Sequence, residues 1–456
     1  MSRCHPWVVL LTLLLGTTPL KAAAPVPRWD PATTWALIAG VVRWRDPSLE
    51  AFDAHHRKDL ELMEALSERG VPAAQRTLLI DRRATRGSVL TALAEQVVSA
   101  PPGATFIVYF EGHGLYDDAH QFVLATSETH TDHLDETGLP VAMLLPILAL
   151  RGASDRVLLW GDACYSGHLA AVASALTYLG VPTIALTSAS EVSASSENWT
   201  YTQALIDGLR GRPIIDRDGD GQIRLSEVAE EARQAMRYRE RQPIGWAPIG
   251  FADLVLGPAA EWPKEQQALD LEGELFKRGD WVVARRLDGA RGIARVLGAK
   301  RDEDRPLRLR VEYYDYTDRA FGWAREDRTD PVMFYEYPVG TRLRVEDDEV
   351  QYAARVVKVD AGMHLVHFED WLPGSEREPG DVLPDDEFVT PDQILGHLDP
   401  KEEAAQRVLV EDQGDLYEAV IKGRFHGEVC LRYPGSPFEE DDCVPESRVS
   451  RDTRIP

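Results

Sequence analysis

Two short segments carry the side chains best suited to nucleophilic chemistry. They are FIVYFEGHG at 106–114, which contains His113, and VLLWGDACYSG at 157–167, which contains Cys164. A thiol needs a neighbouring base to become a reactive thiolate at neutral pH, and imidazole is such a base. Each segment is an apolar run that stops at a polar residue, which is typical of a buried strand of a parallel sheet. Two neighbouring strand ends would hold the thiol and the imidazole within reach of each other.

The elements around these segments alternate between strand and helix patterns from residue 30 to residue 256. Unbroken apolar runs predict further strands, and apolar residues three or four positions apart predict helices. The predicted strands cover 35–42, 76–80 and 182–188, and the predicted helices cover 49–69, 88–100 and 168–180. This alternation predicts an α/β fold in which helices cover both faces of a mostly parallel sheet.

The order of the two motifs resembles the caspase-like cysteine peptidases, a group that includes metacaspases, caspases, legumains and their bacterial relatives. In this chain a strand ending in His113-Gly114 precedes a strand ending in DACYSG. The similarity covers roughly residues 33–256 and includes TSASEVSASSENWTYTQALIDGLRG after the second strand. The resemblance implies a caspase-like domain at 30–256 and a cysteine endopeptidase that acts on proteins or peptides and needs no cofactor for catalysis.

The resemblance also implies a role for each residue that matches the family's motifs. Cys164 would be the nucleophile, and His113 would be the general base that later protonates the leaving amine. The backbone N–H groups of Gly114 and Cys164 would form the oxyanion hole. The alternative is a packed histidine and a buried structural cysteine in a scaffold without catalytic activity.

Specificity depends on the residue two positions before the nucleophile, as the resemblance implies, and here it is Asp162. A buried carboxylate favours a cationic partner, so we expect cleavage after Arg or Lys. Legumain-like enzymes also have an acidic residue there and prefer asparagine, and a strand-end carboxylate can instead cap local N–H groups. Ser188 and Glu191 are further pocket candidates. Glu111 stands where the family usually has serine; it would either raise the basicity of His113 or face solvent.

A second motif, DRDGDGQIRLSE, fits the twelve-residue EF-hand calcium loop. Its ligand positions one, three, five, seven and twelve are Asp216, Asp218, Asp220, Gln222 and Glu227. Gly and Pro residues precede the loop, so no regular entering helix adjoins it. The same residues could form an Asx turn that caps the following helix. Calcium is therefore a candidate ligand of the weak extracellular kind, with a purely structural turn as the alternative.

The first 24 residues are typical of a secretory signal peptide. Arg3 and His5 precede the apolar stretch WVVLLTLLL, and Ala22-Ala23-Ala24 supplies small residues for cleavage. That stretch is too short to span a bilayer comfortably, so we expect an exported protein, periplasmic, cell-surface or extracellular, that does not span a membrane. A retained N-terminal anchor is the alternative. The formal charge of −25 argues against a nucleic-acid partner.

Cysteine usage agrees with export to an oxidising compartment. Cys430 and Cys443 lie on either side of a predicted Pro/Gly turn and could close a loop that stabilises the fold by about 3 kcal/mol. Their pairing would leave Cys164 as a free thiol. The alternative is two buried free thiols.

The remainder of the chain follows a predicted linker at 257–275 and changes to short strands with period two and turn signals. A weak internal repeat divides it into 276–335, 338–398 and 403–450, each of which resembles a Tudor or SH3-like β-barrel. Aromatic residues such as Tyr313, Phe368 and Tyr417 would bind cationic side chains or form barrel cores. The ligand is unknown. The alternative function is a non-catalytic binding or adaptor protein that uses these barrels and keeps the peptidase fold as a scaffold.

Overall fold

The structure is a computed structural model of the whole chain. It describes residues 26–191, 193, 195, 198–240, 242–251, 253–264, 276–285, 291–300, 307–314, 319–325, 329–331, 337–347, 350–360, 363–368, 386–389, 393–398, 407–412, 415–425, 428–433 and 442–450. The predicted signal peptide and most of the predicted linker lie outside these residues. Within them, every helix falls short of the length and apolarity needed to cross a membrane.

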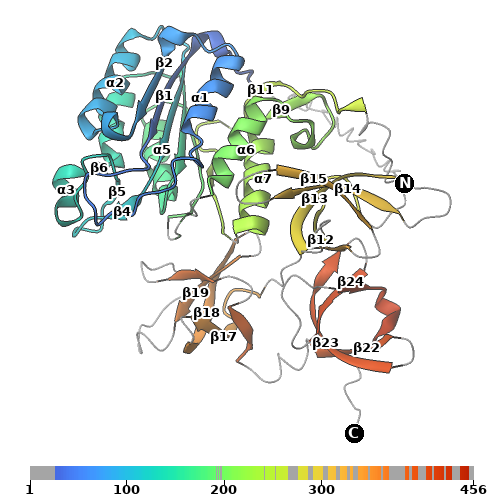
Figure 1. Cartoon of the computed structure of the whole chain (residues 1–456). Coiled ribbons are helices and arrows are strands. Elements are labelled where there is room, and N and C mark those ends of the chain that lie inside the picture. The colour runs from blue at the N-terminus through green and yellow to red at the C-terminus, as the bar shows by residue number, and fades with distance from the viewer. Residues whose placement is uncertain are drawn as a thin grey trace, which may run out of the picture.

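A six-stranded sheet forms the centre of the N-terminal half (Figure 1). Its strands, in spatial order, are β10 (Gly245–Ala247), β8 (Thr183–Thr187), β7 (Arg156–Asp162), β3 (Thr105–Glu111), β1 (Thr34–Gly40) and β2 (Arg76–Ile80). All neighbouring pairs are parallel except β10 with β8 at one edge. Every residue of β3 is buried, which explains its unbroken apolar run. The predicted mostly parallel sheet is confirmed.

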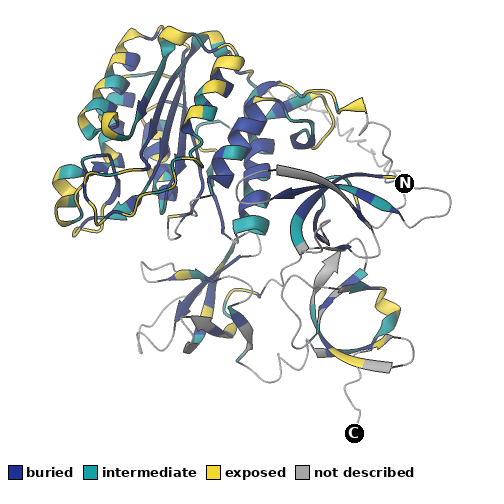
Figure 2. Ribbon diagram, in the orientation of Figure 1, coloured by how far each residue is buried: buried dark blue, intermediate teal, exposed yellow. Residues whose placement is uncertain are grey.

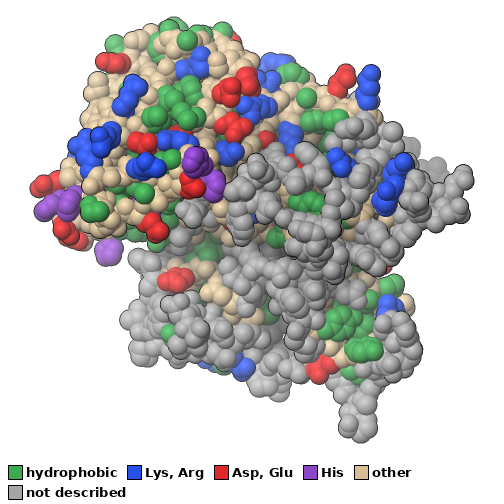
Figure 3. Space-filling view, in the orientation of Figure 1, with side chains coloured by type: hydrophobic (Ala, Val, Ile, Leu, Met, Phe, Trp, Pro, Cys, Tyr) green, Lys and Arg blue, Asp and Glu red, His purple; other side chains and the backbone are tan. Residues whose placement is uncertain are grey.

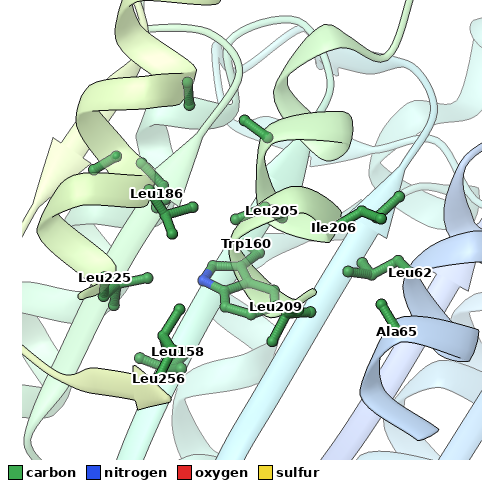
Figure 4. Packing of buried hydrophobic residues seen from close by; sticks show 14 of the residues in the cluster. Leu62, Ala65, Leu158, Trp160, Leu186, Leu205, Ile206, Leu209, Leu225 and Leu256 are labelled. Atoms are coloured by element: carbon green, nitrogen blue, oxygen red, sulfur yellow. The ribbon is translucent and has the colours of Figure 1, made fainter. Parts of the chain in front are cut away.

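Helices cover both faces of this sheet, and Figure 2 shows how far the residues of each helix are buried. The helices are α1 (Asp59–Glu68), α2 (Arg86–Ser99), α4 (Leu145–Leu148), α5 (Leu169–Tyr178), α6 (Thr200–Leu209) and α7 (Leu225–Ala235). One apolar cluster joins Ile38 and Trp160 to α1, α6 and α7 (Figure 4), and another joins Leu37 and Leu159 to α2, α4 and α5. Successive strand residues thus enter opposite cores, as the pleat requires.

One predicted element is wrong in extent. The apolar spacing predicts a helix over 49–69, but α1 begins only at Asp59, and residues 49–58 form turns and irregular backbone. A tertiary contact explains the late start of the helix. The ring of Phe52 packs on the ring of His113 and not on the sheet. This irregular segment contributes to the site described below.

The C-terminal half contains three five-stranded antiparallel sheets that repeat one strand order. They are β12 (Trp281–Arg285), β13 (Arg291–Lys300), β14 (Arg308–Tyr314), β15 (Arg319–Arg325) and β16 (Thr329–Pro331); β17 (Arg342–Asp347), β18 (Val350–Asp360), β19 (Met363–Phe368), β20 (Glu387–Val389) and β21 (Ile394–His397); and β22 (Arg407–Asp412), β23 (Asp415–Phe425), β24 (Glu428–Arg432), β25 (Asp442–Val444) and β26 (Val449–Ser450). In each sheet the fifth strand pairs with the first, and the second and third strands carry a register shift. Each sheet has its own apolar core, which includes Tyr313 in the first and Phe368 in the second, whereas Tyr417 in the third is exposed.

The first of these sheets packs on the α/β part through α7 (Figure 1). Trp281 and Tyr314 form an apolar cluster with Ala235 at the end of that helix. Beside them the guanidinium of Arg295 donates to both carboxylate oxygens of Glu231, and both side chains are buried. A buried ion pair therefore marks the contact between the two halves.

On the face of the α/β part shown in Figure 3, acidic and basic side chains are interspersed.

Candidate active site

The predicted base and nucleophile follow two neighbouring strands at the same level. Strands β3 and β7 are parallel, and Glu111 lies opposite Asp162 in their register. His113 and Cys164 each come two residues after that pair, so both lie at the carboxyl edge of the sheet. The backbones also touch there, because a Cβ placed on Gly114 would collide with the carbonyl oxygen of Cys164. Glycine at position 114 is thus required for the close approach.

The imidazole of His113 is fixed on three sides. Its ring centroid lies 4.4 Å from that of Trp44 and 4.4 Å from that of Phe52. Its Nε2 lies 2.8 Å from the carbonyl oxygen of Glu50. A carbonyl oxygen only accepts, so Nε2 carries the hydrogen and the neutral ring keeps an unprotonated Nδ1. Burial lowers the pKa of His113, which favours this neutral form and its use as a base.

The sequence did not reveal Trp44, Phe52 or the Glu50 carbonyl as parts of the site. A backbone carbonyl has no sequence signature, because every residue supplies one. Phe52 lies in the segment 49–69, whose apolar spacing predicts a helix, and Trp44 lies just before that segment. An aromatic cluster just after the first strand was the available signal.

Cys164 lies at a sharp turn between β7 and α5. The next residue, Tyr165, has a φ of 57°, in the left-handed region. Ser193 and Ser195 lie beside this turn: the N–H of Tyr165 donates to the carbonyl oxygen of Ser193 at 2.8 Å, and the N–H of Ser195 donates to the Sγ of Cys164 at 3.2 Å. Burial raises the pKa of the Cys164 thiol, and the Ser195 N–H opposes that effect in part. The described state therefore favours the protonated thiol over the thiolate.

Asp162 is buried beneath the thiol and accepts hydrogen bonds from two sides. Its Oδ2 accepts from the hydroxyl of Thr202 at 2.6 Å and from the N–H of Thr202 at 3.3 Å. Its Oδ1 lies 3.4 Å from the hydroxyl of Ser195, which in turn lies 2.7 Å from the hydroxyl of Ser188. Burial raises the pKa of Asp162 to about 6. The carboxylate caps the first turn of α6, as is expected of a strand-end carboxylate with a structural role. It also faces Ser195, whose N–H contacts the thiol sulfur.

The two other predicted pocket residues lie in different places. Ser188 belongs to the hydrogen-bonded group around Asp162. The carbonyl oxygen of Glu191 accepts from the hydroxyl of Tyr116 at 2.7 Å, and the Glu191 side chain is exposed. The structure thus joins Ser188 to Asp162 and places Glu191 beside Tyr116. The pocket roles of both residues stay predictions.

One expectation for Glu111 is wrong, because its side chain is fully buried and does not face solvent. Burial is the main cause of the lowered pKa of His113, and an effect of Glu111 on the basicity of that ring stays a prediction. The carboxylate turns back under the sheet edge, where its Oε2 accepts from the hydroxyl of Tyr109 at 2.8 Å.

The loop at 216–227 brings together part of the predicted calcium ligand set. Carboxylate oxygens of Asp216, Asp218 and Glu227 lie within 4.8 Å of one another. Both oxygens of Glu227 also accept backbone N–H groups, from Arg217 and Arg224 at 2.8 Å each. The loop therefore has the oxygen donors that calcium prefers and, at the same time, the turn and cap of the structural alternative.

Two further features of this loop affect its ability to bind calcium. The guanidinium of Arg224 contacts Asp218 at 2.7 Å and also contacts Asp220, so a cation of the chain already lies against these carboxylates. The amide of Gln222 donates to the carbonyl oxygen of Gly221 at 2.8 Å. Calcium would have to compete with Arg224 for the same oxygens, and binding stays a prediction.

The predicted cysteine pair lies on neighbouring strands. Cys430 in β24 is directly opposite Cys443 in β25, and Cys443 is disulfide-bonded, whereas Cys164 is free. The side chain of Cys430 lies outside the described part of the structure. Directly opposed cross-strand positions have the Cβ separation that a disulfide requires.

Comparisons with known proteins gave matches among solved structures only. No model of a protein family matches the chain, and no curated protein matches it. The chain is similar to protein GSU0716 from Geobacter sulfurreducens at 15% identity, covering 50% of this chain and 95% of that one with a TM-score of 0.32. It is similar to caspase-1 from Spodoptera frugiperda at 13% identity, covering 53% and 98% with a TM-score of 0.32. A structure of pro-sf-caspase-1 matches at 12% identity, covering 52% and 96% with a TM-score of 0.33.

Proposed function

We propose that this protein is a cysteine endopeptidase of the caspase-like type. The observation that carries the proposal is the state of His113, whose Nε2–H is engaged by the Glu50 carbonyl while Nδ1 stays unprotonated at the strand end next to Cys164. Such a histidine is oriented as a base before substrate arrives. A packed structural histidine could make the same hydrogen bond to Glu50, but it would not need the adjacent thiol.

The reaction follows from these groups. Nδ1 of His113 takes the thiol proton, and the Cys164 sulfur attacks the carbonyl carbon of the scissile bond. The oxygen gains negative charge beside the N–H groups of Gly114 and Cys164. The imidazolium then gives its proton to the amine as the C–N bond breaks, and water hydrolyses the thioester with the histidine again as base.

The substrate class we propose is a chain with Arg or Lys before the scissile bond. Support comes from Asp162, which is buried near the thiol and faces Ser188 and Ser195. A cationic side chain near this buried carboxylate compensates the carboxylate for its desolvation, whereas an uncharged side chain does not. Asparagine remains the competing preference.

We propose that residues 1–24 direct export and are removed, and that the three C-terminal sheets are Tudor or SH3-like modules for a ligand not yet known. No cofactor is needed for the catalytic steps above.

A second candidate function is a binding protein whose peptidase fold serves only as a scaffold. One observation favours it: burial raises the pKa of Cys164 and the N–H of Ser195 already lies on its sulfur. Burial reduces the thiolate fraction, and the Ser195 N–H, although it favours the thiolate, occupies the attacking sulfur in the described state.

Cleavage of fluorogenic peptides with Arg, Lys, Asn or Asp before the scissile bond tests these candidates. The mature protein and its Cys164→Ala and His113→Ala variants would be compared, with calcium and with a chelator. We expect cleavage after Arg and Lys that both variants abolish. A folded protein that cleaves none of the peptides, and whose Cys164 is not labelled by a peptide with Arg joined to a thiol-reactive group, would favour the binding protein.

A further inference from the structure

Four buried side chains form a continuous chain of hydrogen bonds beneath the site. The hydroxyl of Tyr109 lies 2.8 Å from Oε2 of Glu111 and 2.7 Å from the hydroxyl of Thr202, which lies 2.6 Å from Oδ2 of Asp162. All four residues are buried. The chain thus runs from one carboxyl group to another through two hydroxyl groups, and each of its three contacts has hydrogen-bond length.

The number of hydrogens in this chain decides its protonation. Three hydrogen bonds need three hydrogens, and the hydroxyl groups of Tyr109 and Thr202 supply one each. If Glu111 and Asp162 were both ionised, one of the three contacts would bring two oxygen lone pairs together in a buried place, which is strongly unfavourable. The third hydrogen must therefore come from a carboxyl group at one end.

We propose that Glu111 and Asp162 share one proton through Tyr109 and Thr202. With the proton on Glu111, each group donates to the next and Asp162 is the anionic acceptor at the end. When every hydrogen crosses its hydrogen bond toward Asp162, the donors reverse, Asp162 becomes the acid and Glu111 the anion. No atom is gained or lost, and the net charge of the pair stays at minus one in both arrangements.

The charges around the pair agree with a single shared proton. Burial is the largest influence on both carboxyl groups and raises both pKa values, that of Glu111 well above its usual range. The nearby Asp59 also raises the pKa of Glu111, whereas Arg57 lowers it. Arg57 is itself bonded to Asp59 at 2.8 Å and to Asp81 at 2.8 Å.

Around the other end of the chain, Glu240 raises the pKa of Asp162, and the hydroxyls of Thr202 and Ser188 lower it. The charges of Glu111 and Asp162 raise the pKa of Tyr109, and the charge of Asp162 raises the pKa of Glu111, whereas the hydrogen bond from Tyr109 lowers the pKa of Glu111. A second ionisation of the pair is thus opposed from both ends.

The shared proton makes Glu111 a positioning residue for specificity, a role that rests on the proposed peptidase function. A cationic substrate side chain near Asp162 stabilises the arrangement with the proton on Glu111. An asparagine side chain can instead accept a hydrogen bond from the acid form of Asp162. Glu111 therefore determines how much of the time Asp162 presents a charge to the substrate.

Infrared spectroscopy tests the shared proton without reference to activity. In wild-type protein at neutral pH, we expect a carbonyl band of a buried carboxylic acid that shifts on 13C labelling of glutamate or aspartate carboxyl groups. Glu111→Gln and Asp162→Asn should each remove this band, because the introduced amide supplies the third hydrogen and the remaining carboxylate ionises. Glu95→Gln, at an exposed site, should keep it.

Two results would overturn the proposal. One is a wild-type spectrum with no such band at neutral pH, a measurement that needs no variant to fold. The other is a band that persists in folded Asp162→Asn, since Glu111 would then be protonated by burial alone.

Peptide cleavage reads out the consequence for substrates. Glu111→Gln fixes the direction in which the hydroxyl groups donate, toward an ionised Asp162. The preference of this variant for Arg over Asn peptides should therefore equal or exceed that of wild type, and it should not change between neutral and alkaline pH. The effect should lie in KM and not in kcat. A protein that cleaves no peptide but shows the infrared pattern would refute the peptidase and leave the shared proton standing.

Discussion

The backbone N–H of Ser195 donates to the Sγ of Cys164 at 3.2 Å, while the hydroxyl of the same residue reaches toward Asp162. One residue thus contacts both the predicted nucleophile and the predicted specificity carboxylate. A substrate residue attacked by the sulfur, with its side chain directed at Asp162, would need the same space. We therefore expect substrate to reach the sulfur only when Ser195 leaves these contacts.

Ser195→Ala should make Cys164 more reactive. The change removes the hydroxyl contacts to Ser188 and Asp162 and leaves the backbone in place. The loss of a hydrogen bond worth about 1 kcal/mol would increase the fraction of molecules in which the thiol is accessible about fivefold. The rate of alkylation by iodoacetamide should increase by the same factor. Ser174→Ala, at an exposed position on α5, is the control. An unchanged rate would show that Ser195 does not restrict access to the thiol.

Phe52→Ala should raise the pKa of His113. Burial is the main cause of its lowered pKa, and Phe52 covers one side of the ring. Opening that side to water favours the imidazolium, so the acid limb of activity should move to higher pH. An NMR titration of the ring protons measures the shift directly. Phe52→Leu keeps an apolar cover and should stay close to wild type; equal shifts in both variants would point to a change in the Glu50 contact instead.

Asp162 should make the fold less stable as the pH rises. Its pKa is raised from 3.8 to about 6, so the native state binds more protons than the unfolded state between these values. The free energy of unfolding then falls as pH rises through this window, by about 3 kcal/mol in total. Urea unfolding from pH 4 to pH 7 should show this fall in wild type and a smaller one in Asp162→Asn. Parallel curves for the two proteins would contradict the raised pKa.

Calcium binding at 216–227 gives a prediction specific to this chain. The guanidinium of Arg224 lies against Asp218 and Asp220, so Arg224→Gln removes a competing cation. We expect calorimetry at millimolar calcium to show binding in wild type, about fivefold tighter binding in Arg224→Gln, and none in Asp218→Asn. The absence of heat in both wild type and Arg224→Gln would identify the loop as a structural turn.

The buried ion pair of Glu231 and Arg295 should couple the stability of α7 to that of the first C-terminal sheet. Glu231→Ala leaves a buried cation unpaired and should cost about 3–5 kcal/mol in the free energy of unfolding. The double variant Glu231→Leu with Arg295→Met removes both charges and should recover most of that loss. Denaturant unfolding of the three proteins measures both effects. A single variant that unfolds like wild type would mean that water reaches the pair.

The α/β class, the strands of the central sheet and the two residues that follow them could be predicted from the sequence alone. Buried parallel strands are readable because both of their faces are covered, so that nearly every side chain in the run is apolar until the strand ends. The strands expected at 76–80 and 182–188 and the helix expected at 88–100 are present within two residues. His113 and Cys164 could be singled out because each follows such a strand, and Asp162 because of its place before the thiol.

The surroundings of these side chains depend on the tertiary structure. The Glu50 carbonyl, the Ser195 N–H and the hydroxyls of Tyr109 and Thr202 come from segments far apart in the chain, and their contacts leave no pattern in the sequence. Glu111 shows the difference most clearly, because a carboxylate two residues before the predicted base is expected to be exposed or to neighbour that base. The pleat of β3 turns it the other way, into a buried chain of hydrogen bonds with Asp162. Local sequence determines which atoms are available, whereas packing sets the distances on which their protonation depends.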